Sequence, residues 1–173
     1  MKRLFILLLS LFIAFPLFSA SYSFRISASA GMRVVNIEDD WTRAQMDYLL
    51  SLDALAVRFD RHRISLPFFA GYTDKSAVDA QYNFLSPYYS LGIGLEYDYA
   101  FTDILELRNS ICYIFRYYYN MNGLLNEIRL QSSIAYTFSK FFSITMPVSV
   151  SFSKDEIDFL IGLGISVNLE ASR

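Results

Sequence analysis

The feature that most constrains the fold of this chain is an alternation of apolar and polar residues that recurs after residue 20. In the first such segment, residues 21–36, the even positions from Tyr22 to Val34 are apolar, and the odd positions from Ser21 to Arg33 are serine, glycine or arginine. A period of two places successive side chains on opposite faces of a β-strand. The pattern therefore predicts strands whose two faces have different surroundings.

The same alternation predicts eight strands and two kinds of connection between them. The predicted strands are 21–36, 46–59, 63–73, 88–101, 105–119, 126–138, 142–153 and 159–169. The connections after the even strands are tight, at 60–62, 102–104 and 139–141, and those after the odd strands are longer, at 37–45, 74–87, 120–125 and 154–158. Short turns at one end and longer loops at the other are typical of transmembrane antiparallel barrels. We predict an all-β, eight-stranded antiparallel barrel as one domain, residues 21–173, with both chain ends on the short-turn, periplasmic side.

The composition of the two faces decides between a soluble and a membrane barrel. A soluble lipocalin-like barrel has an apolar interior and a charged exterior, whereas the polar face here is mostly small residues with isolated charges, which suits a narrow interior. The apolar face is layered, with aliphatic residues between two groups of aromatic residues. The group towards the short turns is Tyr22, Phe24, Tyr97, Tyr99, Phe101, Tyr136, Phe138 and Phe142, and the group towards the long loops is Tyr48, Tyr72, Tyr89, Phe115, Tyr117, Phe152 and Phe159. Aromatic girdles around an aliphatic band indicate contact with membrane lipid.

The first 20 residues, MKRLFILLLSLFIAFPLFSA, have the three parts of a secretory signal: basic residues, an apolar core and small residues at the end. The apolar run of roughly 15 residues, broken by Pro16, is shorter than the ~20 residues that a membrane-spanning helix needs. We therefore predict a signal peptide over 1–20, cleaved between Ser19 and Ser23, and export through the general secretion route.

Charge and cysteine content exclude several classes of protein. Fifteen Lys and Arg against 17 Asp and Glu give a net charge of −2, which lacks the basic footprint of a nucleic-acid-binding protein. The single cysteine, Cys112, excludes a disulfide framework and a Cys-rich metal site. We expect Cys112 to be a small packed residue on the polar face.

Candidate catalytic and metal-binding groups are few. The one histidine, His62, lies in a predicted turn between two arginines, where we expect it to be solvated. Asp39 and Asp40 are adjacent loop carboxylates without a third ligand, and such pairs are usually solvated as well. We predict no catalytic residues, no metal, no cofactor and no enzymatic activity.

The charged residues of the polar face are the most informative group. A charge inside a low-dielectric tube must be paired or hydrated. We expect Arg33 to lie opposite Asp47, Arg108 to reach Glu96 or Asp98, Arg116 to meet Glu127 and Arg129, and Glu170 to lie beside Arg25. The predicted charge network of the barrel interior is Arg25, Arg33, Asp47, Asp53, Glu96, Asp98, Glu106, Arg108, Arg116, Glu127, Arg129 and Glu170. Two interpretations remain: side-chain filling that fixes the strands, or a gated polar path.

In architecture, residues 21–170 resemble the small eight-stranded outer-membrane barrels of the OmpA/OmpX/OmpW-like group. The resemblance implies a location in the outer membrane of a diderm bacterium, contact with its lipid and its barrel-assembly machinery, a host or surface ligand bound through the loops, and a monomer. With no catalytic site found, we predict a non-enzymatic structural or surface-interaction protein whose interior is plugged by the charged and small polar side chains of the inner face. The alternative is a narrow channel for small or hydrophobic solutes, which apolar residues on the inner face favour: Leu49, Leu55, Val57, Phe59, Ile114 and Leu160.

Overall fold

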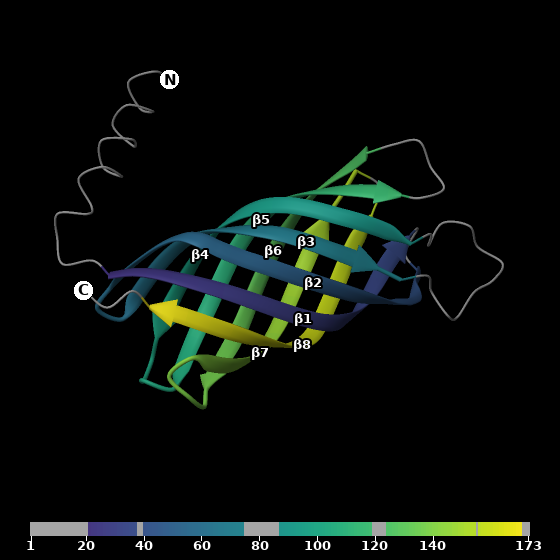
Figure 1. Ribbon diagram of the computed structural model, residues 1–173. Helices are drawn as coiled ribbons and strands as arrows, with labels where there is room; N and C mark the ends of the chain where they lie inside the picture. Colours follow the sequence, from purple (N-terminus) through teal and green to yellow (C-terminus); the bar gives the residue numbers. More distant parts are fainter. Residues whose placement is uncertain (1–20, 38–39, 75–86, 119–123, 155, 171–173) are drawn as a thin grey trace, which may run out of the picture.

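The computed structural model describes residues 21–37, 40–74, 87–118, 124–154 and 156–170. They form a closed barrel of eight strands in which each strand is antiparallel to its neighbours and β8 pairs with β1 (Figure 1). The strands are β1 (Ser21–Ile37), β2 (Asp40–Phe59), β3 (His62–Thr73), β4 (Tyr88–Ala100), β5 (Leu105–Tyr118), β6 (Leu124–Thr137), β7 (Phe142–Phe152) and β8 (Ile157–Glu170). The predicted fold is confirmed. The predicted signal peptide lies outside the described residues.

The start of β1 and the end of β8 lie side by side at one end of the barrel, because Ser23 is paired with Glu170 (Figure 1). We call this the short-turn end and the opposite end the long-loop end.

The three short turns are stabilised by contacts within each turn. Asp60 adopts a positive φ of 52° between β2 and β3. The hydroxyl of Thr102 accepts the amides of Ile104 and Leu105 at 3.3 and 3.1 Å, and the hydroxyl of Ser139 accepts the amide of Phe142 at 3.1 Å.

The first two strands differ from the prediction at their long-loop ends. The segment 37–45 was expected to be a loop, but β1 continues to Ile37 and β2 begins at Asp40. Arg43 pairs with Val35 in this extension. The connection therefore shortens to residues 38–39. The acidic pair Asp39–Asp40 falls at this edge, where no side chain is described.

A β-bulge in β2 also changes the predicted inner face of the barrel. The register with β3 shifts between Asp53, which pairs with Pro67, and Leu55, which pairs with Leu66. A bulge adds one residue to one strand and so exchanges the faces beyond it. As a result Leu55 is 60% exposed on the outer wall. Val57 and Phe59 pair with Ile64 and His62 on that same outer wall, so the predicted inward orientation of Leu55, Val57 and Phe59 is wrong.

The outer wall is a continuous apolar surface bounded by aromatic rings. At the long-loop end the Tyr72 ring lies 6.5 Å from Tyr48 and 5.3 Å from Tyr89, centre to centre. At the short-turn end Tyr99 contacts Phe101 at 5.1 Å. The aliphatic side chains exposed between the girdles include Ile93, Ile111, Leu130, Ile134, Ile161 and Leu163. This is the outer surface of a barrel that spans a bilayer. No helix among the described residues is long and apolar enough to cross a membrane.

His62 does not lie in a solvated turn as predicted. It is the first residue of β3, and its ring packs 5.4 Å from Phe59 and 5.3 Å from Tyr99. Its Nδ1 is 2.7 Å from the hydroxyl of Tyr97. His62 is therefore part of the aromatic girdle at the short-turn end.

A charged side chain placed in the middle of the lipid-facing surface is expected to destabilise the barrel more than one placed near its end. Ile111 is 51% exposed on β5, so Ile111→Arg is expected to lower the free energy of unfolding by about 2–4 kcal/mol. The matched control is Leu124→Arg at the long-loop end of β6, where the cost should be about 1 kcal/mol or less. Urea unfolding of the vesicle-inserted barrel measures both. Equal costs at the two positions would contradict a depth-dependent lipid contact.

Candidate functional site: two charge clusters inside the barrel

Most of the charged side chains of the strands lie inside the barrel and are buried. An eight-stranded barrel has an interior just wide enough for side chains to fill. Here that space holds six arginines, each at most 4% exposed, with carboxylates packed between them. The charges gather in two clusters, one near each end.

The first group, the short-turn cluster, is centred on Arg25 of β1. It is defined by Arg25, Arg63, Arg108, Asp53, Glu96, Asp98 and Glu106. The Arg25 guanidinium lies 2.7 Å from Asp53 and 2.9 Å from Asp98, and it also pairs with Glu96. The carboxylate of Glu106 is 3.8 Å away. Arg25 thus bridges three other strands, β2, β4 and β5, across the interior.

The two other arginines of this cluster extend it around the wall. Arg63 donates to Asp53 and Asp98, both at 3.0 Å, and its Nε donates to the hydroxyl of Ser23 at 2.9 Å. Arg108 donates to Glu106 at 2.9 Å and to Ser166 at 3.1 Å. Every strand from β1 to β5 is therefore linked to this cluster by a charged side chain, and β8 is linked by a hydroxyl.

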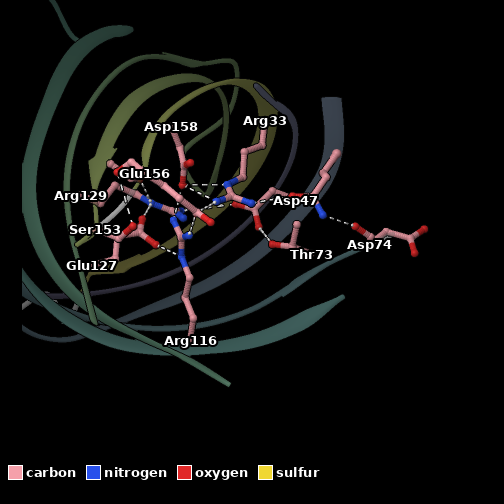
Figure 2. Close-up of polar contacts among 12 residues, drawn as sticks. Arg33, Asp47, Thr73, Asp74, Arg116, Glu127, Arg129, Ser153, Glu156 and Asp158 are labelled. Atoms are coloured by element: carbon pink, nitrogen blue, oxygen red, sulfur yellow. Dashed lines mark hydrogen bonds and ion pairs between the residues drawn. The ribbon is translucent and has the colours of Figure 1, made fainter. Parts of the chain in front are cut away.

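The second group, the long-loop cluster, is defined by Arg33, Arg116, Arg129, Asp47, Glu127, Glu156 and Asp158. Figure 2 shows Arg33 and Arg116 reaching towards each other from opposite walls. Asp158 lies between them, accepting from Arg33 at 2.5 Å and pairing with Arg116. Glu156 also pairs with both, at 3.3 and 3.2 Å. The buried ring of Tyr88 lies 5.2 Å from the Arg33 guanidinium and 5.1 Å from that of Arg116, so both also make cation–π contacts with it.

Arg129 completes the long-loop cluster on β6. Its Nε donates to Glu127 at 2.9 Å, and Glu127 also pairs with Arg116. The Nη1 atom of Arg129 lies 3.4 Å from the carboxylate of Asp47. Asp47 in turn accepts the hydroxyl of Thr73 at 2.5 Å (Figure 2). In the described part of the chain, each cluster thus sets three arginines against four carboxylates.

An apolar layer separates the two clusters. Phe69, Cys112 and Ile114 are buried together, and Leu49 packs against them. Cys112 is 2% exposed beside the hydroxyl of Ser110, so it occupies the small packed position expected of it. On the side of β2, β3 and β5 the interior therefore holds charges, apolar side chains, and charges again.

Several predicted pairings inside the barrel differ in the structure. Arg33 is opposite Gln45, not Asp47, and donates to its amide oxygen at 2.6 Å. Arg108 lies directly opposite Asp98 in the register of β4 and β5, as expected. Its ion pair, however, is with Glu106 of its own strand, while Glu96 and Asp98 pair with Arg25 and Arg63. The expected contact of Arg116 with Glu127 and Arg129 with Glu127 is present.

The predicted position of Glu170 is only partly described. Its backbone pairs with Ser23, whereas Arg25 pairs with Asn168, and the Glu170 side chain lies outside the described residues. Three charged members of the clusters were missed from sequence: Arg63, Glu156 and Asp158. Arg63 lies two residues before Ser65 on β3 and so on the same face of the strand. The alternation could therefore have placed Arg63 inside the barrel. Glu156 and Asp158 fall in the segment that was predicted to be a loop.

We searched the described residues for groups suited to catalysis or to metal binding. No group of three or more His, Cys, Asp and Glu side chains suited to a metal ion occurs among them. The contacts of His62 in this part of the chain are aromatic rings and a tyrosine hydroxyl, so it has no serine or carboxylate beside it.

Comparison with solved structures finds the same barrel in outer-membrane proteins. Ail, the attachment invasion locus protein of Yersinia pestis, solved in complex with the heparin analogue sucrose octasulfate, matches with a TM-score of 0.59 and 11% identity over 85% of this chain and 98% of that chain. Neisserial surface protein A matches with a TM-score of 0.55 and 12% identity over 84% and 98%. The outer membrane enzyme PagL matches with a TM-score of 0.51 and 15% identity over 82% and 98%.

No protein-family model and no curated protein matches the chain. At these identities the structural matches establish the fold and leave the activity open, since they include both a surface protein and an enzyme. The strand number, the closed antiparallel order, the apolar outer wall and the structural matches agree with one another. The chain therefore has the fold of the small eight-stranded transmembrane barrels of bacterial outer membranes.

Proposed function

We propose that this protein is a closed, non-enzymatic outer-membrane barrel with a structural or surface-interaction role. The observation that carries the proposal is the pair of charge clusters, which fill the interior at both ends with buried, mutually paired side chains. An interior held shut in this way leaves the outer wall and the loops as the working surfaces. In this account the barrel reaches the membrane by the general secretion route and the assembly machinery, and it functions as a monomer in lipid.

The surface role follows from the two ends of the barrel. With the chain ends and short turns in the periplasm, the four connections at the long-loop end face outward, where a host or surface ligand would bind. Ail was solved with a heparin analogue, so a barrel of this fold is known in complex with a sulfated sugar. The absence of a Ser–His–acid arrangement around His62 in the described part of the chain supports a non-enzymatic role.

The alternative function, a narrow channel for small or hydrophobic solutes, has less support. Three of the apolar residues expected to line the interior, Leu55, Val57 and Phe59, are on the outer wall. Two that do lie inside, Leu49 and Ile114, belong to the packed apolar group between the two clusters. A channel would require both clusters to open.

Solute flux separates the two functions. Vesicles carrying the barrel and diluted into an isotonic solution of arabinose should swell no faster than protein-free vesicles, because paired charges close the path. The control is the variant Arg25→Ala with Arg116→Ala, which removes a central arginine from each cluster. Swelling by the unaltered barrel at the rate of that variant would favour the channel.

A further inference from the structure

Two polar residues interrupt the lipid-facing surface of the barrel. Asn109 of β5 and Ser132 of β6 point outward and are exposed. Tyrosines aside, and away from the first and last three residues of each strand, they are the only polar side chains on the outer wall among the described residues. Polar groups that face a bilayer are costly and commonly mark a functional site.

The two residues form one unit. They are directly paired across β5 and β6, and the Ser132 hydroxyl donates to Oδ1 of Asn109 at 3.0 Å. This hydrogen bond satisfies the carbonyl of the Asn109 amide. Among the described residues, its Nδ2 has no hydrogen-bond partner, so two amide protons point from the wall with no acceptor.

A hollow lies over this pair. From β4 to β7, cross-strand pairing places Tyr97, Asn109, Ser132 and Val148 side by side in one row on the outer wall, and the last three side chains are short. Ile111, Leu130 and Val150 form the row beside it. The resulting hollow has a volume of about 570 Å³ and is lined by Leu95 and Tyr97 in addition to the residues of these two rows. The hollow is shallow and open towards the lipid, so an occupant would lie along the wall with one side exposed.

The position of Asn109 along the barrel axis indicates which hydrogen-bond acceptors of the lipid lie next to its amide protons. Tyr97, paired with Asn109, belongs to the girdle at the short-turn end, where its hydroxyl is bonded to His62. Aromatic girdles lie at the level of the lipid headgroups. The acceptors found next to that level, on the hydrocarbon side, are the ester carbonyls of glycerophospholipids.

We propose that the Asn109–Ser132 hollow is a binding site for one ester-linked phospholipid of the leaflet at the short-turn end. The amide of Asn109 donates to an acyl ester carbonyl, and one acyl chain lies in the hollow against Ile111, Leu130 and Val150. This inference rests on the membrane-spanning fold and does not depend on whether the interior is closed.

The test compares ester and ether lipids on the unaltered protein. The full chain is inserted into vesicles of dipalmitoyl phosphatidylethanolamine or of its dialkyl ether analogue, which lacks the carbonyls, and transferred to detergent for native mass spectrometry. We expect one retained lipid per barrel from the ester vesicles and roughly five- to tenfold lower occupancy from the ether vesicles, the effect of about one hydrogen bond in an apolar setting.

A variant locates the site. Asn109→Leu with Ser132→Ala restores an apolar wall and should reduce ester-lipid occupancy by a similar factor, while Ile128→Leu, elsewhere on β6, should leave it unchanged. Equal occupancy in the variant and the unaltered protein, or equal occupancy of ester and ether lipids, would overturn the proposal. A third result would also overturn the proposal. If the unaltered barrel is a dimer and the double variant is a monomer that retains its lipid, the Asn109–Ser132 pair joins two copies of the chain.

Discussion

Replacing Arg25 by methionine is expected to lower the free energy of unfolding by about 3–5 kcal/mol, the cost of removing one partner from a buried ionic group. Arg25 contacts Asp53, Glu96 and Asp98 directly and Glu106 at 3.8 Å. Without it, four carboxylates would share the two remaining arginines of the short-turn cluster. Urea unfolding of the vesicle-inserted barrel, followed by the heat-modifiable mobility of the folded form, measures the change.

Two controls make this prediction specific. Arg61→Met, at the exposed turn between β2 and β3, removes the same charge from solvent and should cost less than about 1 kcal/mol. Arg25→Met combined with Glu96→Gln and Asp98→Asn should regain part of the lost stability, because neutral side chains need no counter-charge. A cost for Arg25→Met as small as that for Arg61→Met would mean that the short-turn cluster does not stabilise the barrel.

The second large effect is expected at Asp158, the carboxylate between Arg33 and Arg116. Asp158→Asn keeps the size of the side chain and removes its charge. The two buried guanidinium groups, 5.2 and 5.1 Å from the centre of the Tyr88 ring, then lose the anion that lies between them. We expect the free energy of unfolding to fall by about 2–4 kcal/mol. The same unfolding measurement applies.

Glu156 provides the matched comparison for Asp158. It pairs with the same two arginines, at 3.3 and 3.2 Å, but its side chain is 18% exposed where that of Asp158 is 2% exposed. Water screens the more exposed carboxylate, so Glu156→Gln should cost less than Asp158→Asn. The reverse order would show that Asp158 is not the central anion of the long-loop cluster.

The alternation in the sequence was sufficient to predict the barrel because each strand separates an apolar wall from a polar interior. It failed where both faces of a strand are apolar. Residues Leu55 to Phe59 of β2 carry aliphatic or aromatic side chains at almost every position, so the bulge after Asp53 leaves no trace in the pattern. It also failed at the ends of β1 and β2, where hydrogen bonding across the pair extends the strands beyond the alternating residues.

The charge clusters were only partly predictable for a different reason. Alternation identifies which side chains enter the interior, and it placed Arg25, Asp53 and Asp98 on the polar face. Pairings between neighbouring strands can be sought from sequence, as for Arg116 with Glu127. Arg25, however, reaches Asp98 on β4, 73 residues away and not adjacent to β1. Contacts across the barrel depend on the tilt and stagger of the strands, which the alternation of apolar and polar residues does not specify.

The most direct test of the closed barrel is the conductance of single barrels in a planar lipid bilayer. The unaltered protein should give no steady conductance, because both charge clusters occupy the path. The variant Arg25→Ala with Arg116→Ala, which removes one central arginine from each cluster, should give measurable openings. A steady conductance of the unaltered protein that this variant leaves unchanged would contradict the account and show that the charge clusters do not close the barrel.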